Sequence, residues 1–433
     1  MNKLPVDWPF NPKRTPFFYG WVVWGFSTLG FLMSIPGQTM GMAVFTDPLI
    51  DVTGLTRTEL SMAYLIGTVA SSLFLTRAGQ WYDRYGGRIM IPIASVCLAV
   101  MVTLISLVDV VVGLIGGGAF VFMLFGYFGV RFFGQGLLTS CSRNVLVLWF
   151  VKRRGLVSGF RSVFVSFGFS IAPLFLAFLI AAYDWRTALW WLAAIVLIYA
   201  VFALIFVRDN PASVGLAADG GDPATSHTSD LEVPSKSLSE ARVDPVFWIY
   251  SASLGFHGLI GTALTFHVVS IFSEAGRSRE EAFGYFFPAA IFSTLTNLLA
   301  SWLVDRRTLK TFLIVMLCSN AAGTYGLLNL AEPWGFWLLA AGFGCGGGLW
   351  GVISNLAYIR FYGPLNLGAI SGLNTSLTVF ASAIGPAAFS LGLDAFGDYA
   401  AAIQVSLGAV LFLLVAALFI PQHEVRPGLP ISN

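Results

Sequence analysis

The chain has 433 residues, of which 57% are hydrophobic and 11% are charged, and its formal net charge at pH 7 is +2. Soluble domains carry about 25% charged residues, so this composition excludes a water-soluble globule and indicates a polytopic membrane protein. The charge is nearly balanced and no long basic run occurs, so we expect no nucleic-acid partner.

Apolar runs that are long enough to cross a bilayer as helices recur along the whole chain. They predict an all-α membrane protein with twelve transmembrane helices, in contact with the lipid bilayer. The polar, proline-rich residues 1–17 show no removable signal peptide, so the first span is expected to direct insertion. The predicted spans are 18–46, 58–78, 89–108, 113–148, 156–182, 187–207, 245–273, 281–304, 311–331, 333–360, 368–393 and 399–420.

Residues 208–243 are rich in Asp, Ser, Gly, Thr and Pro, a composition that cannot bury a core and that predicts a linker. This linker would separate an N-terminal six-helix bundle, 18–207, from a C-terminal bundle, 244–420, with a tail at 421–433. Within the linker, the run Ser237-Leu238-Ser239-Glu240 has capping-box spacing, which allows a short surface helix.

Two features suggest that the bundles are related copies. Gly155-x-x-Ser158-Gly159 opens the fifth span as Gly368-x-x-Ser371-Gly372 opens the eleventh, and Ala172-Pro173 and Gly385-Pro386 follow at equal separations. The halves are therefore expected to be pseudo-symmetric about the membrane normal. Lysines and arginines gather on the side of the N-terminus, which predicts a multi-pass protein of the cell membrane with both termini in the cytoplasm.

The four cysteines all fall in apolar runs, and their spacing matches neither a disulfide framework nor a metal site. We expect small buried thiols and no resident metal. The cysteines are Cys97, Cys141, Cys318 and Cys345.

A charged stretch from Gly79 to Arg88 lies between the second and third spans and predicts a turn at the membrane surface. Its pattern, Gly-x-x-x-Asp-Arg-x-Gly-Gly-Arg, resembles the loop signature between helices 2 and 3 of the major facilitator superfamily. In that family the loop carries a conformational latch. The resemblance implies that the gating residues are Gly79, Asp83, Arg84, Gly87 and Arg88, with Asp305 and Arg306 as a partial repeat in the second half.

The positive-inside rule explains the arginines of this stretch, but it does not explain Asp83. A carboxylate suits the positive end of a neighbouring helix, where it gains up to ~2 kcal/mol. We expect Asp83 to dock at the start of the eleventh span, near Gly368, and to hold the inner gate shut in the outward-open state.

Charged residues inside spans are costly and are therefore functional candidates, and no Asp or Glu lies well inside a predicted span. The ionisable groups within spans are basic or neutral, which indicates that the cargo is an anion. They are Arg131, Arg143, Arg161, His257 and His267. Arg143 lies near the cytoplasmic edge, where snorkelling to the surface is the alternative to a functional role.

Arg131 lies near the middle of the fourth span, in one polar stripe with Tyr127 and Gln135. The run Arg131-x-x-Gly134-Gln135-Gly136 resembles the superfamily's fourth-helix motif, whose arginine is implicated in coupling and substrate binding. Gly and Gln are shifted here against the commoner Arg-x-x-Gln-Gly order. An arginine that bonds backbone carbonyls and joins helices is the alternative interpretation.

Further polar candidates come from spans 1, 5, 7 and 10. Pro36-Gly37 predicts a break in span 1 beside Gln38 and Thr39, and His257 could relay a proton or be a core histidine. In the family, spans 1, 4, 7 and 10 line a central cavity between the halves. The predicted substrate-binding residues are Arg131, Gln38, Tyr127, Gln135, His257, Asn355, Tyr358 and Arg161.

Other motifs limit the function. Gly342-x-Gly344-x-x-Gly347 lies in an apolar span without a βαβ unit, so it indicates helix packing and not a dinucleotide site. Gly168-x-x-x-Ala172-Pro173 resembles a degenerate form of the superfamily's fifth-helix exchanger motif, which argues against exchange. No Gly-x-x-x-x-Gly-Lys-[Ser/Thr] loop occurs, so ATP is not expected to be the direct energy source. We expect no cofactor.

Three stretches resemble monocarboxylate and oxalate/formate-type porters within the superfamily: 149–156, Tyr183-Asp184-Trp185-Arg186 and Phe247-Trp248. The resemblance implies a secondary transporter of a small organic anion, working by alternating access. Proton symport would need His257 or the substrate's own carboxylate as carrier. An exporter of neutral hydrophobic or drug-like solutes is the alternative, and a membrane enzyme or a transport-dead receptor is a more distant one because no catalytic constellation appears.

Overall fold

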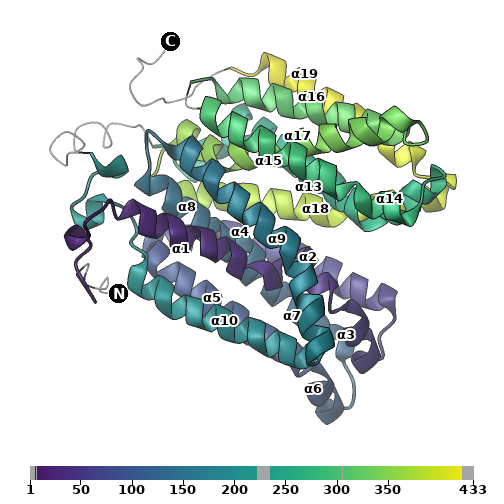
Figure 1. Ribbon diagram of the computed structural model, residues 1–433, viewed down its shortest axis with the longest axis horizontal. Helices are drawn as coiled ribbons and strands as arrows, with labels where there is room; N and C mark the ends of the chain where they lie inside the picture. Colours follow the sequence, from purple (N-terminus) through teal and green to yellow (C-terminus); the bar gives the residue numbers. More distant parts are fainter. Residues whose placement is uncertain (1–4, 6, 222–234, 305, 422–433) are drawn as a thin grey trace. The chain divides into compact units, whose positions relative to one another are not determined.

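The structure is a computed structural model that describes residue 5 and residues 7–221, 235–304 and 306–421 (Figure 1). Most of these residues are helical and none of them forms a strand, so the predicted all-α fold is confirmed. Asp305, most of the tail and part of the linker lie outside the described residues. Nine helices among the described residues are long and apolar enough to cross a membrane.

The chain forms two compact units. The first contains Met1–Val151, Phe164–Pro234 and Pro364–Ser376, and the second contains Lys152–Val163, Ser235–Gly363 and Leu377–Asn433. Two long helices, α9 and α18, have residues in both units. The division into two contiguous six-helix bundles at the linker stays a prediction.

Each predicted span coincides with one helix or with consecutive helical pieces. The pieces in the first half are α1 (Gly20–Met33), η2 (Ile35–Gly37), α2 (Thr39–Ala43), α3 (Thr46–Thr53), α4 (Arg57–Tyr85), α5 (Gly87–Ser106), α6 (Val108–Ile115), α7 (Ala119–Val130), η3 (Arg131–Leu138), α8 (Thr139–Trp149), α9 (Arg154–Ala182) and α10 (Trp185–Phe206).

The second half has one short helix before its spans, at the place where the capping-box spacing allowed one. In α12, the Ser237 hydroxyl accepts from the Glu240 backbone and the Glu240 carboxylate accepts from the Ser237 backbone. The helices are α12 (Leu238–Val243), α13 (Pro245–Glu274), α14 (Arg279–Gly284), α15 (Phe286–Leu303), α16 (Leu309–Leu328), α17 (Pro333–Tyr362), α18 (Leu367–Phe396) and α19 (Ala400–Phe419).

The charged stretch 79–88 is mostly helical, which corrects the prediction of a ten-residue turn. Helix α4 continues to Tyr85 and α5 begins at Gly87, so Gly86 alone makes the turn. Gly86 has φ 81°, a left-handed conformation that glycine adopts without the steric cost of a side chain. The charged side chains are therefore placed by a rigid helix end.

The cysteine prediction is correct only in part. Cys141 is buried, but Cys97 and Cys345 are half-buried and Cys318 is exposed on α16. A thiol behaves as a small apolar group, so a helix face turned toward lipid accommodates it without protein cover.

Close packing explains the glycine-rich α17. A side chain at Gly342 would meet the backbone of Gly323 at 2.3 Å, and one at Gly344 would meet the Ala289 carbonyl at 2.5 Å. These glycines therefore lie where α17 packs against α16 and α15, as the helix-packing interpretation expected.

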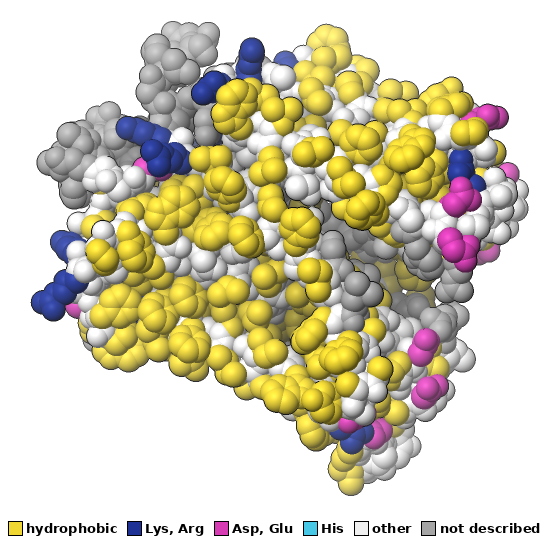
Figure 2. All heavy atoms as spheres, viewed as in Figure 1, with side chains coloured by type: hydrophobic (Ala, Val, Ile, Leu, Met, Phe, Trp, Pro, Cys, Tyr) yellow, Lys and Arg dark blue, Asp and Glu magenta, His cyan; other side chains and the backbone are white. Residues whose placement is uncertain are grey.

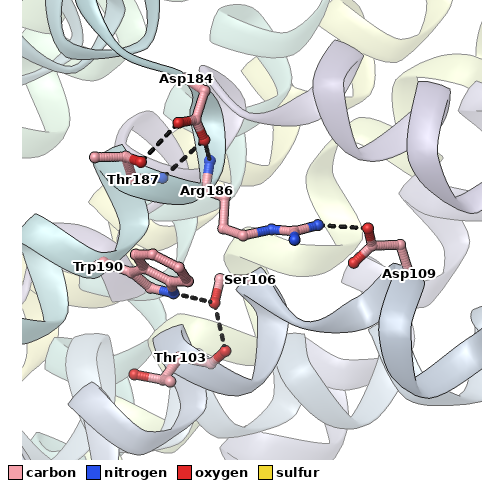
Figure 3. Close-up of polar contacts among 7 residues, drawn as sticks. All are labelled: Thr103, Ser106, Asp109, Asp184, Arg186, Thr187 and Trp190. Carbon is pink, nitrogen blue, oxygen red and sulfur yellow. Dashed lines mark hydrogen bonds and ion pairs between the residues drawn. The ribbon is translucent and has the colours of Figure 1, made fainter.

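In the first unit, α5 and α10 lie side by side (Figure 1). Figure 3 shows the polar contacts that join them at one end. Asp184 caps α10 by accepting from the Arg186 and Thr187 backbone at 2.8 and 2.9 Å. Arg186 forms an ion pair with Asp109 of α6, and the Trp190 indole donates to Ser106 of α5 at 2.9 Å. The stretch 183–186 therefore has a local structural role.

On the face that Figure 2 shows, large apolar side chains cover much of the surface and charged side chains gather toward its edges. On α9, for example, Phe167 and Phe178 are 61% and 65% exposed. Apolar exposure on this scale suits lipid contact and not water.

Candidate functional site

The first unit brings Asp83, near the end of α4, to the start of α18. Its two carboxylate oxygens accept hydrogen bonds from the backbone N–H groups of Gly368 and Ala369, at 2.7 and 2.8 Å. The first N–H groups of a helix have no partner within the helix, so the carboxylate satisfies two of them. The residue as a whole is exposed while its carboxylate lies against α18.

Two glycines allow this close approach. A side chain at Gly79 would lie 1.9 Å from the Gly368 carbonyl oxygen, and one at Gly368 would lie 2.4 Å from the Gly79 carbonyl oxygen. Any residue larger than glycine would therefore separate α4 from α18. We call the set Gly79, Asp83, Gly368 and Ala369 the latch.

The surroundings of the latch are polar and tightly closed. Asn144 donates to Ser371 at 3.0 Å, and Arg143 donates to Thr375 at 3.1 Å. Arg143 is 9% exposed, so snorkelling to the surface does not describe it. A cavity of only about 10 Å³ remains between α4, α8 and α18, and its walls include Cys141 and Gly372.

Burial of the Asp83 carboxylate against α18 raises its pKa to about 6, and the two backbone hydrogen bonds act in the opposite direction. Asp83 lies beyond the apolar run 58–78, where water and protons have access. The docked carboxylate therefore titrates close to the physiological range.

Arg88 takes no part in the latch and instead bonds backbone carbonyls elsewhere in the first unit. Its guanidinium is buried and donates to the Pro5 carbonyl at 2.9 Å and to the Leu204 carbonyl at 3.4 Å. It also donates to the Trp8 carbonyl. Arg208 donates to the Trp8 carbonyl at 3.0 Å. We call Pro5 and residues 7–19 the strap, because these two arginines fasten it to the first unit.

Three other predicted gating residues lie apart from the latch contact. Gly87 is buried as the first residue of α5, and a side chain there would meet Val145 at 3.2 Å. The Arg84 guanidinium lies 5.4 Å from the ring centre of Tyr85. Arg306 lies over Trp302 at 4.7 Å. Asp305 is not among the described residues.

Arg131 is 2% exposed at the junction of α7 and η3. Its Nη1 donates to the Gly37 carbonyl at 3.0 Å and lies 3.4 Å from the Thr39 hydroxyl. Nε is enclosed without a partner, while Nη2 donates to no described group and is not fully enclosed. Among the described residues, Arg131 forms no ion pair.

Tyr64 completes the surroundings of Arg131, and the sequence did not single it out. The guanidinium carbon lies 5.2 Å from its ring centre, which is a cation–π distance. The Tyr64 hydroxyl donates to Thr39 at 2.8 Å, and its ring meets Tyr127 edge-on at 5.1 Å. Nothing in the apolar run 58–78 distinguishes this tyrosine until the helices are placed together.

The π-helix explains the shifted fourth-helix motif. Gly134 is one extra residue between Arg131 and the Gln-Gly pair, and the segment Arg131–Leu138 is a π-helix, whose wider turns accommodate an extra residue. The break in span 1 meets this segment, because a side chain at Gly37 would lie 2.6 Å from the Gln135 backbone nitrogen. The predicted break at Pro36-Gly37 therefore places the carbonyl of Gly37 against Arg131.

Two glutamines flank this arrangement. Gln38 is the first residue after η2 and donates to Ser34 at 3.1 Å. The Gln135 side-chain oxygen is enclosed without a hydrogen-bond partner among the described residues. Arg131, Tyr127, Gln135 and Gln38 thus all belong to the first unit.

The other four predicted substrate residues belong to the second unit. Arg161 is 2% exposed and donates to the Asn355 side-chain oxygen. The Tyr358 hydroxyl bonds Ser251 at 2.9 Å in a buried position. The half-buried His257 bonds Asn320 through Nδ1 at 3.0 Å. His267 bonds the Pro386 carbonyl at 3.0 Å and Tyr399 at 3.1 Å.

A family model described as Major Facilitator Superfamily matches residues 26–386. The chain belongs to this superfamily, so the resemblance drawn from its loop signature is confirmed. The fold and the family are those of transporters rather than enzymes. The resemblance to monocarboxylate and oxalate/formate-type porters stays a prediction.

Solved structures of the same fold are distant in sequence. The proton:xylose symporter XylE, bound to 6-bromo-6-deoxy-D-glucose, has a TM-score of 0.73 at 16% identity, over 93% of this chain and 96% of that one. The transporter FucP in the outward conformation has a TM-score of 0.66 at 16% identity, over 92% and 98%.

A bacterial homologue of the iron transporter ferroportin, in an outward-facing state, has a TM-score of 0.69 at 18% identity, over 92% and 98%. At these identities the likeness concerns the fold alone. The search of curated proteins found no match.

Proposed function

We propose that this transporter moves a small organic anion, of the monocarboxylate type, by alternating access as a secondary active carrier. The observation that carries the proposal is Arg131, which is buried in the fourth span and has no carboxylate partner among the described residues. An arginine does not lose its charge in a protein, so neutralisation must come from another group. A carboxylate on the cargo would supply it.

The contacts of Arg131 leave room for this role. Nη1 donates hydrogen bonds to the Gly37 carbonyl and the Thr39 hydroxyl, while Nη2 donates to no described group. A purely structural arginine would be expected to have most of its donors paired, because enclosed donors without acceptors are costly. The free donors favour an anion that arrives and leaves.

The latch supports the alternating-access part of the proposal. Asp83 docks on the N–H groups of Gly368 and Ala369, a contact that involves one carboxylate and no covalent bond. Such a contact is suited to forming and breaking in each cycle. We propose that it closes the cytoplasmic side when the outer side is open, with both termini in the cytoplasm and the two bundles moving about the cargo.

Proton symport is an addition to the proposal, with His257 as the protein group involved. Its Nδ1 faces the Asn320 oxygen at 3.0 Å, so donation by Nδ1–H leaves Nε2 as the proton acceptor. The cargo's own carboxylate is the alternative carrier. The proton:xylose symporter shows that proton coupling occurs on this fold, although at 16% identity it says nothing of this chain's coupling ion.

The test is counterflow into proteoliposomes with a panel of labelled acids, comparing wild type with Arg131→Gln. Removing one partner of a buried, hydrogen-bonded charge pair costs about 2–5 kcal/mol, so binding of the transported acid should fall at least tenfold. Arg186→Gln is the matched control, because Arg186 is paired with Asp109 near the surface. Equal counterflow by wild type and Arg131→Gln would contradict the proposal.

Export of a neutral hydrophobic solute is the second candidate. The aromatic pair Tyr64 and Tyr127 beside Arg131 favours it, because aromatic walls accept apolar cargo. In that case Arg131 would only join η3 to Gly37. Competition by neutral aromatic solutes that persists in Arg131→Gln would support this alternative.

A further inference from the structure

The Thr39 hydroxyl has an unusual set of contacts. It accepts from the Tyr64 hydroxyl at 2.8 Å and lies 3.4 Å from Nη1 of Arg131. A hydroxyl has two acceptor lone pairs and one O–H donor, so both lone pairs are occupied. Within the described part of the chain, Thr39 donates to no group, and the residue is exposed. Its O–H is therefore a free donor beside a buried cation.

The guanidinium of Arg131 cannot bind a carboxylate with two of its own nitrogens in this arrangement. Nη1 is used by the Gly37 carbonyl and faces Thr39, and Nε is enclosed. Only Nη2 remains. A carboxylate that meets Nη2 still has a second oxygen, and that oxygen needs another donor.

We propose that Thr39 supplies this second donor and that Tyr64 orients it, so that the cargo's carboxylate bridges Nη2 of Arg131 and the Thr39 hydroxyl. The proposal rests on the proposed anion function and names the chemistry that its site recognises. Thr39 would touch the cargo. Tyr64 is a positioning residue, which acts through Thr39 and through the face of the guanidinium.

The geometry of Tyr64 explains why Thr39 is held with its proton outward. The edge-on contact with Tyr127 fixes the Tyr64 ring, and the Tyr64 proton occupies one Thr39 lone pair. Hydrogen bonds in such a chain polarise one another, which makes the last donor stronger. The site should accordingly prefer a compact carboxylate to a carboxamide of the same shape, which carries no charge for Arg131.

The test measures binding to the full-length purified protein. The probes are sodium acetate, pyruvate, L-lactate and benzoate, with sodium chloride for ionic strength and the matching amides for charge, and the readout is the saturable shift in unfolding temperature. The variants are Thr39→Val, Thr39→Ser and Tyr64→Phe, with Arg131→Gln for the anion site itself. Thr103→Val and Tyr183→Phe are matched controls away from the site.

Loss of one hydrogen bond to a charged group should weaken binding of the best acid about tenfold in Thr39→Val and about threefold or more in Tyr64→Phe. Thr39→Ser, which keeps the hydroxyl, should bind the acid with wild-type affinity. A merely structural role for Thr39 would instead lower stability without changing affinity.

The outcomes distinguish the role of Thr39 from the anion function on which it rests. Wild-type affinity in Thr39→Val, with affinity lost in Arg131→Gln, would overturn the role of Thr39 and leave the anion function standing. Unchanged affinity in Arg131→Gln, or no saturable shift with any acid in wild type, would overturn the anion function and this inference with it.

Discussion

Replacing Asp83 by Asn should release α18 from α4 and favour the inward-open state. The asparagine keeps one carbonyl oxygen, which can accept from one of the two N–H groups at the start of α18. Its other terminal group is an NH₂ donor, which would face the second N–H. One charge-assisted hydrogen bond and the charge at the helix start are lost together.

The magnitude follows from the contacts. A hydrogen bond to a charged group contributes about 1.5–3 kcal/mol, and a charge at an exposed helix start about 0.3–1 kcal/mol. The residue is exposed outside its contact with α18, so the lower ends apply and the loss is about 2 kcal/mol. This corresponds to a roughly 30-fold shift of the docking equilibrium.

Cys141 is a natural reporter of this equilibrium. It is 1% exposed and shares the wall of the 10 Å³ cavity with Gly372 of α18, so a maleimide reaches it only after α18 moves away. In a protein whose other three cysteines are serine, the labelling rate of Cys141 from the cytoplasmic side should rise up to about 30-fold in Asp83→Asn.

Asp51→Asn is the matched control, because it makes the same chemical change at an exposed position on α3. It should label at the wild-type rate. If Asp83→Asn also labels Cys141 at the wild-type rate, the contact with α18 does not hold the gate, and the reasoning is wrong.

Two further predictions concern the latch and the proton. Gly79→Ala places a methyl group 1.9 Å from the Gly368 carbonyl oxygen and should cost about 1–3 kcal/mol of docking, seen as faster Cys141 labelling, whereas Gly113→Ala, with open space around it, should leave the rate unchanged. His257→Gln should abolish stimulation of uptake by an inward proton gradient while counterflow persists; stimulation that survives would assign the proton to the cargo.

The transmembrane helices could be predicted because the length of an apolar run is a direct requirement of the bilayer. The same argument misjudged the stretch 79–88. Its charges suggested a turn, but hydrogen bonding carries α4 to Tyr85, and a single glycine with positive φ then suffices. Local composition does not distinguish a polar helix end from a loop.

The sequence could identify a site residue only where that residue type is itself unusual in an apolar run. Arg131 is conspicuous because a charge in hydrocarbon is costly, whereas Tyr64 is an ordinary residue in an apolar run. Its importance comes from three contacts, with Arg131, Thr39 and Tyr127, that depend on how helices pack. In the sequence, the π-helix at Gly134 appeared only as a one-residue shift in the fourth-helix motif. The structure explains the shift, because the wider π-turn accommodates the extra residue.

The strap is recognised through its main chain. Arg88 and Arg208 bind carbonyl oxygens of Pro5 and Trp8, which every amino acid presents. Substitution of the Pro5 or Trp8 side chain would therefore leave these hydrogen bonds in place, whereas loss of either arginine would remove its own share of them. Arg88 is also the second residue of α5, directly after the turn that ends α4, so a fusion that pulls on the amino terminus would act mechanically on the turn at Gly86.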